Sequence, residues 1–160
     1  MQVLIMYYSK TGNTQKLADA IAHGVRQVDG VACVVKPVAE ITEQDWLAAD
    51  GIIAGSPVYA GSMAAELKTI FDTIGVRNQK MENKIGAAFA TGGFPSGGKE
   101  TTLFSIIQAM LIYSMIVVGD PLEATGHYGV ACVGAPDPET TSHAAKLGKR
   151  VAALVKQLKS

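Results

Sequence analysis

Residues 9–14, with the sequence Ser-Lys-Thr-Gly-Asn-Thr, combine residue types that bind anions. Ser9, Thr11 and Thr14 offer hydroxyl donors, and Gly12 allows a ligand to approach the backbone without a Cβ in the way. If a helix begins here, its first N–H groups have no intrahelical partner and its dipole favours negative charge. Because three hydroxyls and several N–H groups can surround three oxygens, we expect a terminal phosphate monoester. The alternative is an ordinary helix start after a glycine turn.

Two later segments combine an aromatic residue with glycine and proline. Tyr59 lies between Pro57 and Gly61, and an aromatic side chain held in such a loop can lie flat against a planar ring. Residues 91–98 are rich in glycine and contain Phe94, so their backbone N–H groups can come close to ring oxygens and nitrogens. Taken singly, these segments could equally be a surface turn and a flexible surface loop.

The spacing in residues 93–99, Gly-x-x-x-x-Gly-Lys, is that of a nucleotide-binding P-loop. A P-loop continues with Ser or Thr to hold magnesium, whereas this chain has Glu100, which would repel phosphates. Pro95 also removes one backbone N–H from the segment. We therefore do not expect a nucleoside triphosphatase, and without a Gly-x-Gly-x-x-Gly fingerprint we do not expect a dinucleotide-binding Rossmann domain.

Side chains for acid–base catalysis are scarce in this sequence. His23 and His143 fall on helical stretches, and only His127, in a Gly-His-Tyr-Gly segment, is a candidate to assist at a pocket. We find no Ser-His-Asp arrangement and no pair of carboxylates. A phosphate site with aromatic walls but little acid–base machinery indicates that a cofactor carries the chemistry.

Strand and helix patterns alternate along the chain and would position these segments. Strands are expected at residues 3–8, 31–36, 51–55, 84–91 and 115–118, and helices at residues 14–28, 42–47, 62–75, 99–114 and 138–159. Residues 119–135 read as irregular and rich in glycine. Strands that are apolar along nearly their whole length, each followed by a helix, predict an α/β domain with a parallel sheet covered on both faces.

The loops after the first, third and fourth expected strands are the three segments singled out above. Ligands of open parallel sheets bind at the carboxyl ends of the strands, where the strand order reverses. We therefore expect the three loops to converge on one pocket.

Composition limits the function classes further. The 160 residues fit one domain, and 48% hydrophobic with 18% charged residues is typical of a well-packed globular protein. Lys+Arg and Asp+Glu are both 14, so the chain has neither the basic footprint of a nucleic-acid-binding protein nor a strongly acidic docking surface. Cys33 and Cys132 lie in apolar runs and are expected to be buried thiols. With no signal peptide and no membrane span in view, we expect a cytoplasmic protein.

The sequence resembles the flavodoxin family over nearly its whole length. Residues 9–14 after an apolar strand resemble the family's FMN-phosphate loop, and residues 55–63, Gly-Ser-Pro-Val-Tyr-Ala-Gly-Ser-Met, resemble the strand-three loop of one branch. That branch is the tryptophan-repressor-binding-protein type of NAD(P)H:quinone oxidoreductase. Tyr-Tyr-Ser at residues 7–9, Gly-Gly-Lys-Glu at 97–100 and Tyr-Gly at 128–129 are further similarities.

The resemblance implies a flavodoxin-like sheet of five parallel strands in the order 2-1-3-4-5, one bound FMN, NADH or NADPH as donor, and a quinone-like acceptor. It implies that residues 9–14 hold the phosphate, residues 58–60 contact the isoalloxazine, and residues 91–94 wrap its polar edge. The expected cofactor-binding residues are Ser9, Lys10, Thr11, Gly12, Asn13, Thr14, Pro57, Val58, Tyr59, Ala60, Gly61, Thr91, Gly92, Gly93 and Phe94.

The chain also departs from that branch. Ala60 stands where the branch usually has an aromatic residue, and residues 38–50 are too short for the insertion that helps to build its tetramer. A homodimer and a homotetramer both remain open. Two other functions also remain open: a one-electron carrier flavodoxin, and an FMN-bearing regulatory protein that acts on a partner.

Overall fold

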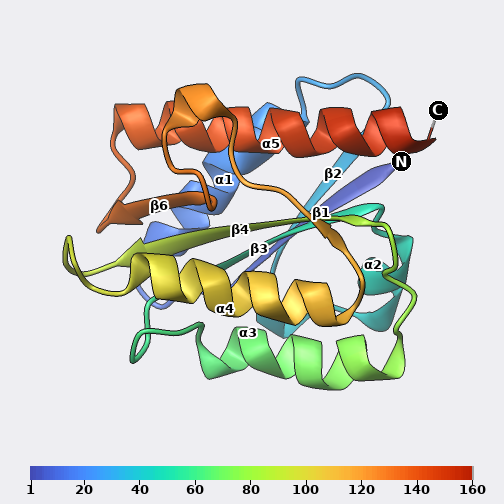
Figure 1. Cartoon of the computed structure of the whole chain (residues 1–160), viewed down its shortest axis with the longest axis horizontal. Coiled ribbons are helices and arrows are strands. Elements are labelled where there is room, and N and C mark those ends of the chain that lie inside the picture. The colour runs from blue at the N-terminus through green and yellow to red at the C-terminus, as the bar shows by residue number, and fades with distance from the viewer. Residues whose placement is uncertain (160) are drawn as a thin grey trace.

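A parallel β-sheet lies between two layers of helices in the computed structural model, which describes residues 1–159 (Figure 1). The strands are β1 (Gln2–Tyr7), β2 (Ala32–Pro37), β3 (Gly51–Pro57), β4 (Ile85–Gly92), β5 (Ile116–Val117) and β6 (Val130–Val133). The α-helices are α1 (Asn13–Val25), α2 (Glu43–Ala48), α3 (Ala65–Ile70), α4 (Lys99–Ile112) and α5 (Pro138–Lys159). A π-helical turn, η2 (Phe71–Gly75), continues α3, and short 3₁₀ turns form at η1 (Val38–Glu40) and η3 (Leu122–Ala124).

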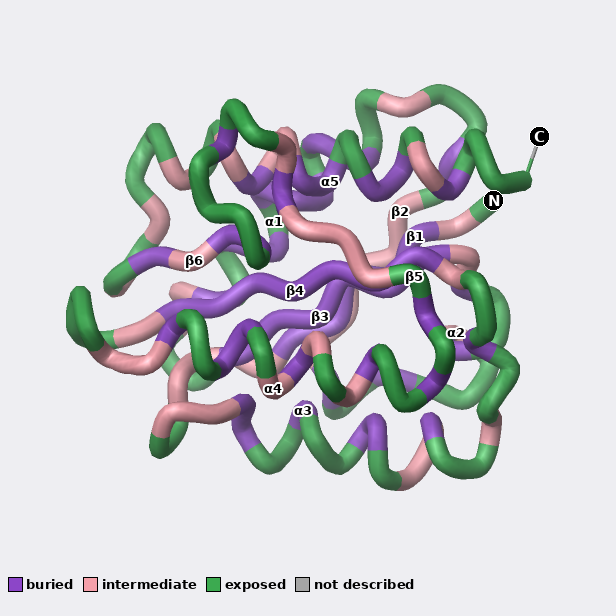
Figure 2. Tube along the Cα trace, in the orientation of Figure 1, coloured by how far each residue is buried: buried purple, intermediate pink, exposed green. Residues whose placement is uncertain are grey.

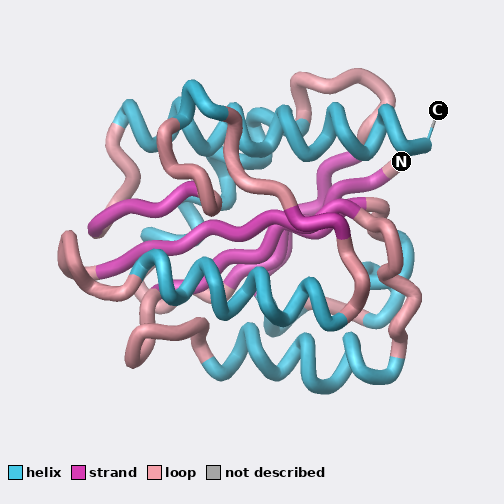
Figure 3. The backbone as a smooth tube through the Cα atoms, in the orientation of Figure 1, coloured by secondary structure: helices cyan, strands magenta, loops and turns pink. Residues whose placement is uncertain are grey.

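The sheet has the order β2-β1-β3-β4-β5, and each of these strands pairs in parallel with its neighbour. This confirms the predicted flavodoxin-like α/β fold and its strand order. Figure 3 shows the strands of this sheet fanning across the centre of the molecule between the helices.

The prediction of five strands was wrong in one respect, because residues 119–135 are not wholly irregular. Within them β6 pairs with the carboxyl-terminal half of β4, from Phe89 to Gly92, whereas β5 pairs only with Ile85 and Gly86. The outer position of the sheet is thus filled by two short strands in succession. The apolar run Val-Ala-Cys-Val lies between Gly129 and Gly134 at the end of a glycine-rich segment, so its strand pattern was not recognised in the sequence.

Two hydrophobic cores lie on the opposite faces of the sheet, and alternate residues of each strand point to each. Figure 2 shows the central strands β3 and β4 buried along most of their length. Val3 and Ile5 face the core beneath α1 and α5, while Leu4 faces the core beneath α2, α3 and α4. α1 and α5 pack closely because Gly24 and Gly148 lie at their contact. A Cβ on Gly24 would lie 1.8 Å from the carbonyl oxygen of Ala145, so no other residue fits there without displacement.

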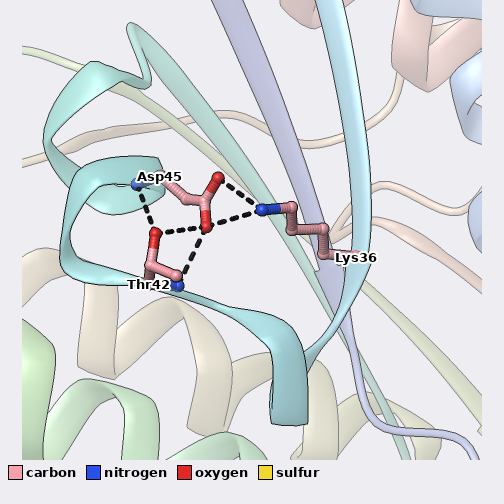
Figure 4. A network of polar contacts seen from close by, with 3 residues as sticks. All are labelled: Lys36, Thr42 and Asp45. Carbon is pink, nitrogen blue, oxygen red and sulfur yellow. Dashed lines mark hydrogen bonds and ion pairs between the residues drawn. The ribbon is translucent and has the colours of Figure 1, made fainter.

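A polar network fixes the start of α2, as the capped helix start in the sequence predicts (Figure 4). The Thr42 hydroxyl accepts from the Asp45 N–H at 3.2 Å, and an Asp45 carboxylate oxygen accepts from the Thr42 N–H at 2.9 Å. Lys36 Nζ on β2 donates to both carboxylate oxygens, at 2.8 and 2.9 Å. Burial alone would raise the pKa of Asp45, but the hydrogen bonds from Lys36 and Thr42 outweigh it and hold that pKa below its ordinary value.

We expect Asp45→Asn to lower the free energy of unfolding at pH 7 by about 1–2 kcal/mol, because it removes charge-assisted hydrogen bonds. The folded-state pKa of Asp45 lies below the ordinary value of 3.8. The stabilisation by its ionised carboxylate is therefore complete above pH 3.8 and is lost as the pH falls through the folded-state pKa. Urea unfolding at pH 7 and pH 3 should therefore show that the free energies of unfolding of variant and parent differ less at pH 3 than at pH 7. Asp72→Asn is the control, because Asp72 forms an exposed pair with Lys68 and should change little.

Candidate functional site

A cavity of about 470 Å³ opens at the carboxyl edge of the sheet, within the size range of small-molecule sites. The loops after β1, β3 and β4 all contribute to it, so the predicted convergence of these three loops is confirmed. A fourth segment, directly after β6, adds one more wall. The lining residues are Lys10, Thr11, Asn13, Thr14, Pro57, Val58, Tyr59, Thr91, Gly92, Gly93 and Gly134.

Five of the predicted binding residues do not line this cavity. They are Ser9, Gly12, Ala60, Gly61 and Phe94. Ser9, Gly12, Ala60 and Gly61 shape the backbone of the lining loops, whereas the Phe94 side chain is 74% exposed. Direct contacts of these five with a cofactor stay a prediction.

The start of α1 presents free hydrogen-bond donors to the cavity. Gly12 is the N-cap in the left-handed conformation, with φ 88°, and it provides no side-chain cap. The Ser9 hydroxyl accepts from the Gln15 N–H at 3.3 Å. The N–H groups of Asn13 and Thr14, the first two helical residues, have no intrahelical acceptor. Together with the ammonium group of Lys10, they make this end of the cavity suited to an anion.

A buried pair of hydroxyls joins the β1 loop to the end of β4. Thr14 Oγ1 and Thr91 Oγ1 lie 2.8 Å apart, and the two residues are 2% and 5% exposed. Each hydroxyl carries one proton, so one of the two donates to the other while the second proton remains available to a ligand. The pair therefore both fixes the loop and keeps one donor for the cavity.

The β3 loop holds Tyr59 on a tight turn. The N–H of Tyr59 donates to the carbonyl of Ser62 and the N–H of Ser62 donates to the carbonyl of Tyr59, both at 3.0 Å. Between them Ala60 and Gly61 have φ of 49° and 75°, as in the hairpin turns that need positive φ at both central positions. The expected helix at residues 62–75 therefore begins only at Ala65.

Two serine hydroxyls fasten the carboxyl-terminal side of the same loop. Buried Ser56 Oγ donates to the Pro57 carbonyl at 2.7 Å and accepts from the Ala64 N–H at 2.8 Å. Ser105 Oγ on α4 accepts from the Met63 N–H at 3.0 Å. The loop that carries Tyr59 is thus fixed before any ligand binds, which lowers the entropy cost of binding.

Lys99 stabilises the loop after β4 rather than reaching into the cavity. Its side chain is buried, and Nζ donates to the carbonyl oxygens of Phe94, at 3.2 Å, and Pro95. The lysine of the P-loop-like spacing is therefore engaged with its own loop, in agreement with the sequence argument against a triphosphate site. Its stem also covers Gly92, since a Cβ there would lie 3.0 Å from Lys99 Cγ.

Gly134 is the lining residue that sequence reasoning missed. It has φ 67°, its N–H donates to the Gly92 carbonyl at 2.8 Å, and a Cβ on it would meet no atom within 4 Å. Because Gly134 lines the cavity, we expect a side chain at this position to project into it. The sequence signal was the apolar run of β6 followed by this glycine, which becomes visible only once the run is recognised as a strand.

The electrostatic character of the cavity is set by one side chain. Lys10 is the only charged residue among those that line it, and no lining residue is acidic. His127 does not line the cavity; it lies in the loop before β6, with φ 68°, at the end of that strand away from Gly134. The geometry thus gives no support to catalytic assistance by His127.

Neither cysteine forms a disulfide, and burial raises the pKa of both thiols, that of Cys132 to about 11. Cys132 is buried as expected, whereas Cys33 is half-buried. Within residues 1–159 there is no cluster of His, Cys, Asp or Glu that could hold a metal ion. The same residues include no helix of the length and apolarity needed to cross a membrane.

Three comparisons with known proteins agree with this architecture. A family model described as NADPH-dependent FMN reductase matches residues 28–128. The chain is 34% identical to an NAD(P)H dehydrogenase (quinone) from Archaeoglobus fulgidus, with 98% of each chain covered. It is also 34% identical to a flavodoxin from Aquifex aeolicus, covering 94% of this chain and 85% of that one. The structure of a WrbA-like flavodoxin from Agrobacterium tumefaciens superposes with a TM-score of 0.83 at 22% identity, covering 98% of each chain.

Proposed function

Since the chain belongs to the NADPH-dependent FMN reductase family, we propose that it uses FMN to pass electrons in pairs from NADH or NADPH to a quinone-like acceptor. The family and its relatives confirm the flavodoxin-like resemblance, FMN as the cofactor and an oxidoreductase activity. The acceptor and the pairwise transfer are our proposal. A cytoplasmic location and a homodimer or homotetramer stay predictions.

The described residues fit FMN. The free N–H groups at the start of α1, Lys10 and the Thr14 hydroxyl would hold the phosphate group at one end of the cavity. Tyr59 and Val58 would contact the planar ring from the β3 loop. On other sides of the cavity Gly93 and Gly134 have no atom within 4 Å of their Cβ positions and leave room for a ring. Bound FMN supplies the capacity to take up and release electrons in pairs.

The observation that carries pairwise transfer is the absence of carboxylates from the cavity lining. Acidic groups around a reduced cofactor oppose the second electron, and a carrier that works in single steps profits from such groups. Here the one charged lining residue is Lys10, which favours added negative charge. The glycines also leave an open face, which a pyridine nucleotide needs in order to approach. The relative from Archaeoglobus fulgidus bears the name of such a dehydrogenase.

A one-electron carrier is the second candidate, because the relative from Aquifex aeolicus is called a flavodoxin. The two functions differ in how the bound flavin is reduced. We expect one molecule of NADH or NADPH per flavin to remove the visible flavin absorbance of the anaerobic protein in one spectral step. A benzoquinone should then restore it quickly. Inertness towards both nucleotides, with two spectrally distinct steps during photoreduction, would instead support the carrier.

A further inference from the structure

Tyr59 is the only aromatic residue that lines the cavity, and one other tyrosine contacts its ring. Tyr8, the residue after β1, lies edge-on to it, with ring centroids 6.1 Å apart and planes at 70°. Tyr8 does not line the same cavity. It lines a neighbouring one of about 460 Å³, together with Glu66 on α3. The Tyr8 ring thus lies outside the cofactor cavity, against the residue that supplies its aromatic wall.

Tyr8 is itself held at both ends. Its N–H donates to the Gly55 carbonyl at 3.1 Å and extends the pairing of β1 with β3. At the other end, the hydrogen bond with the Glu66 carboxylate raises the pKa of Tyr8 to about 12. The phenol therefore stays protonated and able to donate at neutral pH. Glu66 belongs to the first turn of α3, where the helix dipole favours a negative charge.

Tyr59 is fixed through its backbone, and its side chain interacts with Tyr8 through the edge-on ring contact and a side-chain hydrogen bond. The turn bonds to Ser62 fix the main chain, and the residue as a whole is 39% exposed. Within the described residues, Tyr8 provides its only ring-to-ring contact. Without that contact the tyrosine side chain would be free to turn towards solvent, since its backbone does not determine its rotamer.

We propose that Tyr8 is a positioning residue for FMN: its ring, anchored by Glu66, holds the Tyr59 ring in the wall of the cofactor cavity. The inference rests on the proposed function in taking Tyr59 as the residue that flanks the flavin. It adds Tyr8 and Glu66, which do not contact the cofactor themselves but orient Tyr59, which does. The gain is preorganisation, because the wall is in place before FMN arrives.

The test measures FMN binding to the apoprotein and the fluorescence of the bound flavin, with neither nucleotide nor quinone present. We expect Tyr8→Leu to weaken binding roughly three- to tenfold, the range of a lost aromatic pair, and to brighten the bound flavin. Tyr8→Phe keeps the ring but removes the hydroxyl that interacts with Glu66, so it should retain most of the affinity and reduce quenching to the same extent as Glu66→Gln. Tyr128→Leu is the matched control, since Tyr128 is also a tyrosine with a ring contact, to Phe104 at 4.7 Å, but lies outside the cavity.

Coupling to Tyr59 separates positioning from a general loss of structure. In a Tyr59→Ala background, Tyr8→Leu should have no further effect on affinity or fluorescence. Glu66→Gln keeps both rings and provides a second reading if Tyr8→Leu does not fold: it should reduce quenching when Tyr59 is present and change nothing when it is absent.

Parent-like affinity and quenching in Tyr8→Leu and Glu66→Gln would overturn the proposal, as would equal losses with and without Tyr59. Because no turnover is measured, either result leaves the proposed oxidoreductase function untouched. Conversely, a parent protein that binds FMN but does not react with NADH or NADPH would refute that function and leave this test intact.

Discussion

Replacement of Thr14 by valine is expected to weaken FMN binding roughly 10- to 100-fold. The change keeps the shape of the side chain but deletes a hydroxyl at the phosphate end of the cavity, and a hydrogen bond to a charged group contributes about 1.5–3 kcal/mol. It also leaves Thr91 Oγ1 buried without its 2.8 Å partner, so the apoprotein should lose some stability as well. Fluorescence titration of the apoprotein with FMN gives the dissociation constant, and thermal unfolding gives the loss of stability.

Thr73→Val provides the control for this prediction. The Thr73 hydroxyl donates to the Thr69 carbonyl at 2.6 Å, and the residue lies in η2, outside the cavity. Its replacement removes a hydroxyl without touching the phosphate end, so FMN affinity should stay at the level of the parent. If Thr14→Val also binds FMN as tightly as the parent, Thr14 only fixes the helix start and the anion is held elsewhere.

Gly134→Val should cause a loss of FMN affinity of at least tenfold. The side chain would project into the space that is free around this position, within the cavity, and would occupy part of the cofactor's place. Because φ is 67°, the branched residue is also strained, which should lower the free energy of unfolding by about 1–2 kcal/mol. Both quantities can be measured on the same protein, by FMN titration and by urea unfolding of the apoprotein.

Gly30→Val separates the two effects. Gly30 has φ 83°, and a Cβ on it would also meet nothing within 4 Å, but it lies between α1 and β2 and does not line the cavity. We expect a similar loss of stability with FMN affinity unchanged. If both variants lose FMN affinity to the same degree, backbone strain explains the effect and Gly134 does not face the cofactor.

Local sequence signals were sufficient for most of the fold. The change from a strand pattern to a helix pattern at residues 9–14 correctly placed the first loop of the cavity, and the capped start at Thr42 correctly placed α2. Both depend on a few neighbouring residues, which a single sequence contains. The parallel pairing of the strands followed from apolar strands that alternate with helices, whereas their order 2-1-3-4-5 followed from the family resemblance.

The features that were missed depend on contacts between distant residues. Thr14 and Thr91 are 77 positions apart, and nothing in either segment indicates their hydroxyl pair. Gly134 lines the cavity only because β6 pairs with β4, whose paired residues lie 41 positions earlier, as in Phe89 opposite Val130. For Lys99 the sequence argued against a triphosphate site but did not indicate that Nζ donates to a carbonyl of its own loop, which only the folded loop shows.

The division of the outer sheet position between β5 and β6 has a consequence for evolution. β6 is aligned by its pairing with Phe89–Gly92 of β4, so Gly134 reaches the cavity through that pairing. The exposed residues Leu122 and Glu123 lie outside this pairing and can change without a shift in the register of the cofactor site, whereas Gly119 and Gly129 on either side leave no room for a side chain. A protein built in this way can acquire new surface contacts through these two positions while its redox chemistry is inherited unchanged.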